Sequence, residues 1–255
     1  MPSHPIVDDL GVATTLQRPP RTVVSLVPSL TEAIATSRPE LLVAATEWCT
    51  HVGGLDLPRI RGTKNPDVRR ITELKPDLVV CNQEENRELD VRRLRAAGVA
   101  VWVSRIRTLT EALDSMQRLF TQILDGELPD WLAQARELWA VPPTGAGPSV
   151  AVPIWRDPWL VVGSATFTTD LLARLGARNV FDGAAERYPR LSPAEILDAG
   201  PDLVLLPDEP YPFSAGDGPE AFGQQRTALV SGRLLTWYGP SLVRARTALE
   251  SVVRL

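Results

Sequence analysis

Residues 71–80 read Ile-Thr-Glu-Leu-Lys-Pro-Asp-Leu-Val-Val, and residues 196–205 read Ile-Leu-Asp-Ala-Gly-Pro-Asp-Leu-Val-Leu. In both stretches a proline ends a helix-like segment, and an apolar run typical of a buried strand follows. The shared Pro-Asp-Leu-Val units lie 125 positions apart (201 minus 76). Residues 23–28 and 150–153 form a second matched pair, 127 positions apart (150 minus 23). The two offsets predict two similar lobes in tandem.

Strand-like and helix-like segments alternate along the rest of the chain. Apolar runs predict strands at 22–27, 41–46, 78–81, 99–103, 150–154, 203–206 and 234–237. Amphipathic stretches predict helices at 30–36, 68–74, 88–97, 109–124, 129–140, 167–175, 193–199 and 242–255. This alternation is typical of α/β folds with parallel sheets covered by helices. The Pro- and Gly-rich residues 141–148 are the clearest boundary. We therefore expect an N-terminal α/β lobe over 1–107, connecting helices and a Pro-rich joint over 108–147, and a C-terminal α/β lobe over 148–255.

Composition excludes some classes of protein. The 255 residues are 44% hydrophobic and 23% charged, which suffices for a sizeable core. A net charge of −4 argues against a nucleic-acid partner, which needs a basic face. No run approaches the roughly 18–20 apolar residues that span a bilayer, and the first residues lack the apolar core of a secretory leader. We therefore expect a cytoplasmic protein, periplasmic or extracellular only if a leader has been removed, with Cys49 and Cys81 as free thiols.

Several motifs occur in an order that points to a known family. The first half contains Asp8-Asp9-Leu10-Gly11, residues 22–32, residues 47–51, residues 62–65 and residues 82–86. The second half contains Pro-Ile-Trp-Arg-Asp-Pro-Trp at 153–159, Leu-Pro-Asp-Glu-Pro-Tyr-Pro-Phe at 206–213 and Thr-Trp-Tyr-Gly-Pro at 236–240. Together, over residues 8–250, the chain resembles the helical-backbone metal receptors. These are the class III periplasmic substrate-binding proteins of iron-siderophore, haem and vitamin B12 uptake, and the cobalamin-binding branch is the most similar.

The resemblance implies two Rossmann-like lobes joined by one bridging helix, with a ligand in the cleft between them. Residues 129–140 would be that helix, which is shorter than the helix usual in the family, and Arg61 stands where relatives tend to have a glycine. The implied ligand is a corrinoid or another metal chelate, such as haem or an iron siderophore. No other cofactor is firmly implied. The protein is expected to be a monomer, with an ABC permease as partner only if it is exported.

The loops that follow the strand ends are the implied binding site, because α/β sheets generally place ligands there. The residues expected to contact the ligand are Pro28, Ser29, Trp48, His51, Thr63, Lys64, Asn82, Glu84, Glu85, Trp155, Arg156, Trp159, Asp208, Glu209, Tyr211, Phe213, Trp237 and Tyr238. Glu88, and more weakly Glu220, match the positions at which family members dock onto a permease.

Aromatic residues gather on these loops, although they make up only 6% of the chain. Their large rings suit a flat macrocyclic ligand. Packing in the core between the lobes is the alternative explanation. The set comprises Trp48, Trp155, Trp159, Tyr211, Phe213, Trp237 and Tyr238.

Two further hypotheses remain open. Glu47, Cys49 and His51 alternate, so on an extended segment they would point to one side and could bind a soft metal, or His51 could reach the metal of a ligand. A dedicated metal site is not predicted, because the chain has only two histidines. The second hypothesis is an enzyme on the same scaffold, with Glu47, His51, Glu84, Glu85 and Asp208 as candidate acid–base groups. Its catalytic residues stay unknown, because the sequence contains no nucleophile elbow, P-loop or Gly-rich dinucleotide turn.

Overall fold

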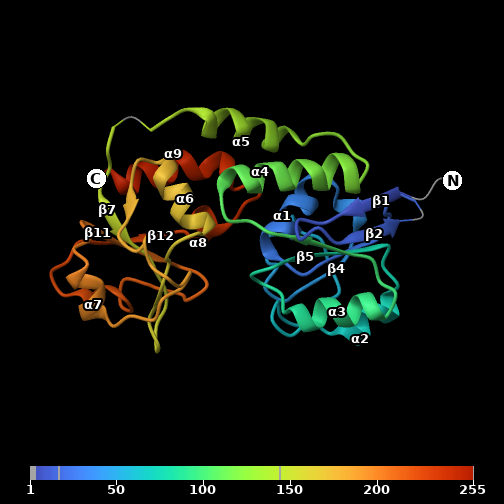
Figure 1. Cartoon of the computed structure of the whole chain (residues 1–255), viewed down its shortest axis with the longest axis horizontal. Helices are drawn as coiled ribbons and strands as arrows, with labels where there is room; N and C mark the ends of the chain where they lie inside the picture. The colour runs from blue at the N-terminus through green and yellow to red at the C-terminus, as the bar shows by residue number, and fades with distance from the viewer. Residues whose placement is uncertain (1–3, 17, 144, 255) are drawn as a thin grey trace. The chain divides into compact units, whose positions relative to one another are not determined.

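A computed structural model describes residues 4–16, 18–143 and 145–254. Two compact units divide the chain (Figure 1). Unit 1 consists of 1–106, 111–133 and 238–240, and unit 2 consists of 107–110, 134–237 and 241–255. The residues expected to form a separate connection, 108–147, are thus shared between the two units.

Unit 1 is built on a four-stranded parallel sheet in the order β4-β3-β5-β6. Its strands are β3 (Val23–Ser25), β4 (Leu42–Ala45), β5 (Leu78–Asn82) and β6 (Val101–Ser104). Helices α2 (Val68–Leu74) and α3 (Glu88–Ala96) lie side by side on one face of the sheet, and α1 (Pro28–Ser37) lies on the other (Figure 1). The remaining elements are the hairpin β1 (His4–Val7) and β2 (Ala13–Leu16), the 3-10 turn η1 (Pro39–Leu41), α4 (Leu109–Arg118) and the π-helical turn η2 (Leu119–Ile123).

Unit 2 repeats this plan with a parallel sheet in the order β10-β7-β11-β12. Its strands are β7 (Ser149–Ala151), β10 (Arg178–Asn179), β11 (Leu203–Pro207) and β12 (Thr227–Val230). Its helices are α6 (Phe167–Arg174), α7 (Pro193–Asp198), α8 (Gly232–Thr236), α9 (Leu242–Val253) and the 3-10 turn η3 (Pro219–Phe222). An antiparallel hairpin of β8 (Pro153–Trp155) and β9 (Leu160–Val161) follows β7. Helix α5 (Asp130–Ala140) begins in unit 1 and ends in unit 2, so the expected bridging helix is present.

The repeat in the sequence is a repeat in topology. Counted along the chain within each unit, both sheets have the strand order second, first, third, fourth. In unit 1 Val23 pairs with Leu78, and in unit 2 Val150 pairs with Leu203. These are the residues that the two matched offsets bring into correspondence. The α/β fold class and the tandem arrangement are therefore confirmed.

The aspartate of each Pro-Asp-Leu-Val unit explains why the pattern recurs. The Asp77 carboxylate accepts hydrogen bonds from the Thr22 amide and hydroxyl, both at 3.0 Å, and the Asp77 amide donates to that hydroxyl at 2.9 Å. The Asp202 carboxylate accepts from the Ser149 amide and hydroxyl, both at 2.7 Å, and its amide donates back at 3.0 Å. In each unit the aspartate thus joins the start of the third strand to the start of the first. We call these two pairs the aspartate clamps.

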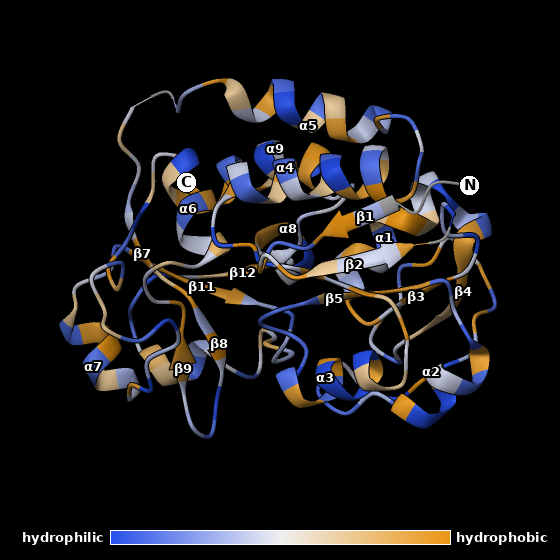
Figure 2. Cartoon of the chain, turned by 45° about the vertical axis from the view of Figure 1, so that its right-hand side comes forward, coloured by the Kyte–Doolittle hydropathy of each residue, from blue (hydrophilic) through white to orange (hydrophobic). Residues whose placement is uncertain are grey.

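Apolar side chains that alternate along the strands form the core of each unit. In unit 1 Val79, Cys81, Val101 and Val103 point to the face covered by α2 and α3, as a period of two requires. Figure 2 shows both helices with hydrophobic and hydrophilic residues interleaved, as expected for helices with one face on a core. In unit 2 Trp159 joins Val204 and Leu206 in the corresponding cluster.

One predicted strand is wrong. Residues 234–237 do not form a strand: Gly232–Thr236 is helix α8, and the fourth strand is β12 at Thr227–Val230. Short apolar runs fit a strand or a buried helix equally well, and here the Gly232 amide donates to Asp208 Oδ1 at 2.7 Å and fixes the start of the helix. The predicted start of α7 is confirmed, with a capping box between Ser192 and Glu195.

Candidate functional site

The loop after β5 carries Glu84 and Glu85 and is held by two buried amides. Asn82 Oδ1 accepts from the amides of Glu84 at 2.8 Å and Glu85 at 3.3 Å. Asn86 Oδ1 accepts from the Asn82 amide at 2.9 Å, and its Nδ2 donates to the carbonyls of Leu26 and Thr63 at 3.2 and 3.0 Å. We call this arrangement the amide network. It joins the loops that follow β3, β4 and β5, and Asn82 and Asn86 are the scaffold of these loops.

The loop that contains Thr63 and Lys64 lies against the same network. The Lys64 ammonium donates to the Glu84 carbonyl. Gly62 lies so close to Trp48 that an added Cβ would be 3.1 Å from Trp48 Nε1. Arg61 has φ +65°, in the left-handed region that favours glycine. This backbone conformation explains why a glycine is expected at position 61.

The loop after β4 is a turn, and this corrects the expected alternation of Glu47, Cys49 and His51. Cys49 points inward with 1% of its surface exposed, and its Sγ lies 3.0 Å from the Thr31 hydroxyl, which donates to it. Burial raises the pKa of this thiol. Glu47 and His51 are exposed, so the three side chains do not share a side. Within the described residues, no three His, Cys, Asp or Glu side chains are grouped so that they could hold a metal ion.

Tyr238 and its neighbours come from late in the chain, yet they belong to unit 1. Gly239 packs so closely on α1 that an added Cβ would lie 3.0 Å from the Ser29 carbonyl oxygen. Burial raises the pKa of the Tyr238 phenol far above its usual range, and the charge of Glu85 raises it further, whereas Ser29 and Ser104 act in the opposite direction. The structure therefore brings Ser29, Glu85 and Tyr238 together beside the amide network.

Unit 2 presents a pair of aromatic side chains, one at the end of β8 and one in the loop after β11. The rings of Trp155 and Tyr211 meet edge to face, with centroids 5.7 Å apart. Trp155 is 42% exposed. Next to it, the Arg156 guanidinium donates to the carboxylates of Asp217 and Glu220.

The other aromatic residues expected at the site of unit 2 are buried. Trp159 stacks on Phe213 with centroids 5.7 Å apart and meets Phe222 edge to face at 5.3 Å. Trp237 is also buried, with the Arg233 guanidinium 5.9 Å from its ring. Core packing, the alternative left open by the sequence, accounts for Trp159 and Phe213, since both belong to the core cluster of unit 2.

The acidic candidates lie in different surroundings. Asp208 and Glu209 follow β11; Asp208 is exposed and Glu209 is half-buried. Glu88 is 84% exposed at the start of α3 and lies 3.8 Å from Arg92. Glu220 accepts from Arg156 at 2.7 Å and from the Gly218 amide at 2.5 Å, which holds the pKa of its carboxyl below the usual range.

Cys49 and Cys81 are both free, as the sequence predicts, and the structure buries them. Across the part of the chain that the structure describes, no helix combines the length and apolar character needed to cross a bilayer.

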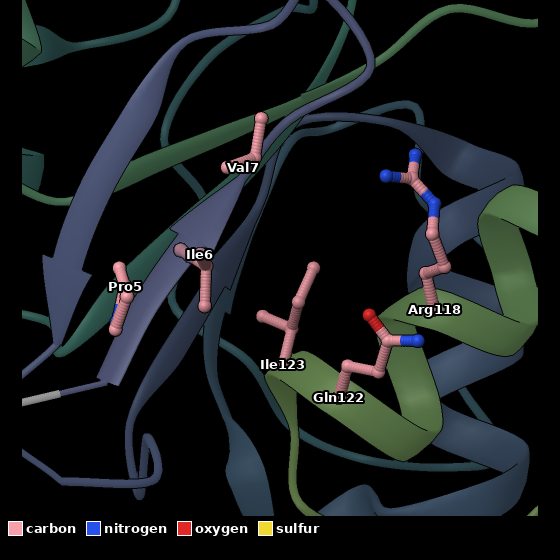
Figure 3. Close-up of a pocket in the computed structure, with 6 residues that line it drawn as sticks. All are labelled: Pro5, Ile6, Val7, Arg118, Gln122 and Ile123. Carbon is pink, nitrogen blue, oxygen red and sulfur yellow. The ribbon is translucent and has the colours of Figure 1, made fainter.

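A cavity of about 180 Å³ lies elsewhere in unit 1, between the N-terminal hairpin and η2 (Figure 3). Its lining combines aliphatic side chains with one guanidinium and one amide. None of the residues expected to bind the ligand lines it. The lining residues are Pro5, Ile6, Val7, Arg118, Gln122 and Ile123.

Sequence reasoning missed Asp217 entirely, and it assigned no structural role to three residues that it quoted, Arg61, Asn86 and Gly239. Asn86 was visible within the quoted 82–86 motif, but nothing in the motif distinguishes a scaffold amide from a ligand contact. Asp217 follows Tyr211 by six positions on an irregular loop, and no periodicity marks it. Only the positive φ at position 61 had a signal, the glycine expected there.

The sequence and the fold were compared with those of known proteins in three ways. No family model matches the chain. A vitamin B12-binding protein of Pectobacterium carotovorum is 24% identical over 200 residues, which cover 75% of this chain and 72% of that protein.

Two solved structures have a similar fold. The periplasmic vitamin B12 binding protein BtuF of Vibrio cholerae superposes with a TM-score of 0.76 at 18% identity, covering 92% of this chain and 97% of that one. The periplasmic haem-binding protein BhuT, solved with two haems, gives a TM-score of 0.70 at 24% identity, with coverages of 92% and 97%. The resemblance of this chain to the helical-backbone metal receptors, the class III substrate-binding proteins, is thus confirmed in sequence and in fold.

Proposed function

We propose that this chain binds a metal chelate and that it prefers a corrinoid to other chelates. The observation that carries the proposal is a solvent-exposed tryptophan beyond the strand ends of each unit. Trp48 is 66% exposed and Trp155 is 42% exposed. An exposed indole costs solvation free energy unless a ligand covers it, and its flat apolar face suits a macrocycle. The names of the relatives, vitamin B12-binding and haem-binding proteins, support the same ligand class.

The proposed contacts are the members of the expected set that stay accessible on the loops. In unit 1 they are Trp48, His51, Thr63, Lys64, Glu84 and Glu85, and in unit 2 they are Trp155, Asp208, Glu209 and Tyr211. Pro28 and Ser29, at the start of α1, are proposed as their support.

The available donor atoms favour a chelate whose metal is already coordinated. The Tyr211 hydroxyl donates to Asp217 at 2.7 Å, and this bond raises the pKa of the phenol. The Cys49 thiol is buried, and its pKa is also raised. A thiolate or phenolate ligand for an open metal position is therefore disfavoured in these loops. His51 is the exposed exception, so a haem would depend on it more than a corrinoid would.

Partner and location are further proposals. The solved relatives are described as periplasmic, so they lend no support to the cytoplasmic location expected from the sequence. An ABC permease is proposed as partner for an exported form, with Glu88 on the docking face. The relatives named above are all binding proteins and give no support to the enzyme hypothesis. Cell fractionation of the native host decides the location.

The test is a calorimetric titration of the purified chain with cyanocobalamin, dicyanocobinamide, haemin and a ferric hydroxamate siderophore. We expect saturable binding of a corrinoid at one equivalent, with haemin weaker. Bovine serum albumin serves as a control for unspecific haemin adsorption. If every probe has a Kd weaker than about 100 µM, a binding free energy near −5.5 kcal/mol, the proposal is wrong.

A further inference from the structure

Arg156 joins two loops of unit 2 through its charged head group. It follows Trp155 at the end of β8, and its side chain is 22% exposed. One guanidinium nitrogen donates to Asp217 and to Glu220, the latter at 2.7 Å. The guanidinium also lies 5.2 Å from the centroid of the Trp159 ring. Asp157 Oδ2 lies 3.7 Å from Arg156 Nε, so Arg156 is engaged within its own unit by three carboxylates and one aromatic face.

These contacts close a ring of four side chains, which we call the Arg156 ring. Arg156 donates to one oxygen of Asp217, and the Tyr211 hydroxyl donates to the other at 2.7 Å. The Tyr211 ring meets Trp155 at an interplanar angle of 80°, and Trp155 precedes Arg156 in the chain. Each member thus limits the rotation of the next.

The ring keeps its protons at neutral pH. The hydrogen bond with Glu220 raises the pKa of Arg156, and the bond with Asp217 raises the pKa of Tyr211. The Arg156 guanidinium and the Tyr211 hydroxyl therefore stay protonated, and continue to donate their hydrogen bonds, at the pH at which a ligand would bind.

We propose that Arg156 is a positioning residue: it acts through Asp217 to hold Trp155 and Tyr211 edge to face, without touching the ligand itself. This inference rests on the proposed function. A pre-oriented aromatic pair lowers the entropy lost when a ligand is bound, because its side chains are already ordered. Glu220 serves as the second anchor of Arg156.

The test combines ligand affinity with a spectroscopic signal from the ligand-free protein. The chain is labelled with 5-fluorotryptophan, and the ¹⁹F resonance of Trp155 is assigned from the spectrum of Trp155→Phe. In Arg156→Gln we expect this resonance to shift and broaden, and cyanocobalamin affinity to fall about tenfold. Tyr211→Phe, which keeps the ring but removes the hydroxyl, should shift the resonance and weaken binding about threefold. Arg156→Lys should restore part of both signals.

Two controls separate positioning from general damage. The double variant Arg156→Gln/Tyr211→Phe should bind no more weakly than Arg156→Gln, because both substitutions open one ring. Arg254→Gln, which removes an exposed arginine paired with Glu250 in the same unit, should change neither signal. Urea unfolding verifies that each variant is folded.

Three outcomes decide the proposal. A loss of affinity in Arg156→Gln with an unchanged Trp155 resonance would show that Arg156 contacts the ligand, and the positioning role would be wrong. Unchanged affinity with an unchanged resonance would overturn it as well. If no chelate binds the wild-type chain, the proposed function is wrong. The Trp155 resonance of ligand-free Arg156→Gln then tests the Arg156 ring by itself: an unchanged resonance rejects the ring, and a shifted and broadened resonance supports it.

Discussion

The two units have separate sheets with the same strand order, and the loops at the strand ends of each unit are held by different side chains. Each unit has the same strand order and its own aspartate clamp. Above that common base, unit 1 holds its loops with the neutral amides of Asn82 and Asn86, whereas unit 2 uses the charged Arg156 ring. The repeat is retained in the strands and the aspartate clamps, and it is lost in the side chains that hold the loops.

The loss of a buried amide should destabilise the fold more than the loss of a partly exposed ion pair does. Asn86 is 5% exposed and satisfies three backbone groups. The Arg156 ring lies nearer to solvent, so water can replace its hydrogen bonds. Unit 1 should therefore lose stability when its loop scaffold is cut, and unit 2 should lose affinity.

The largest expected effect follows from Asn86→Ala. This substitution leaves the Asn82 amide and two carbonyls without partners in a buried region, so we expect the free energy of unfolding to fall by about 3 kcal/mol. Urea unfolding followed by circular dichroism measures it, with Asn65→Ala, at an exposed asparagine of the same unit, as the control. A loss below about 1 kcal/mol would show that the amide network is not a scaffold.

The aspartate clamps should differ in strength although their geometry is alike. Asp77 is 24% exposed and accepts from the Arg21 amide as well as from Thr22. Asp77→Ala should therefore lower the free energy of unfolding by about 2 kcal/mol, because the half-buried amide and hydroxyl of Thr22 lose their acceptor. Asp202 is exposed, and Asp202→Ala should cost less. If Asp202→Ala is the more damaging in urea unfolding, burial does not govern the clamps.

The smallest expected effect is the loss of the stability that the aspartate clamps contribute, as the pH is lowered. Burial raises the pKa of Asp77, but its hydrogen bonds outweigh this and hold the pKa below the ordinary 3.8; the Ser149 hydroxyl does the same for Asp202. Because the pKa of each aspartate is lower in the folded chain, the unfolded chain binds more protons as the pH falls. The stability that each clamp contributes is therefore complete above the pKa of the unfolded chain. It is lost as the pH falls through the pKa of the folded chain.

Unfolding of the wild type, Asp77→Asn and Asp202→Asn at a series of pH values measures this contribution. The difference in stability between the wild type and either variant should be constant above about pH 5 and shrink below about pH 4. A difference that grows on acidification would contradict the assigned direction of the shifts.

The fold could be predicted from the sequence because its signals are local and repeated. The matched offsets and the alternating helix-like and strand-like segments sufficed for the α/β class and for the two tandem lobes. The strand assigned to 234–237 failed because an apolar run of four residues has no period. The short hairpins were missed for the same reason, since β9 has only two residues.

The candidate site was less predictable, because it depends on contacts between residues far apart in the sequence. Trp48 and Trp155 are exposed, but Trp159 packs in a core, and composition alone cannot separate these cases. The inward turn of Cys49 depends on Thr31, which is 18 positions away. Arg156 was expected to face a ligand, and the two carboxylates to which it donates hydrogen bonds lie 61 and 64 positions later.

The central claim is that exposed tryptophans on the strand-end loops bind a metal chelate. Its most direct test is the cyanocobalamin affinity of Trp48→Ala and Trp155→Ala, measured by calorimetry beside Tyr188→Ala, which removes an exposed aromatic ring outside the proposed contacts. The account predicts that both tryptophan variants fold like the wild type and bind at least about tenfold more weakly, whereas Tyr188→Ala binds normally. Wild-type affinity in both tryptophan variants would contradict it.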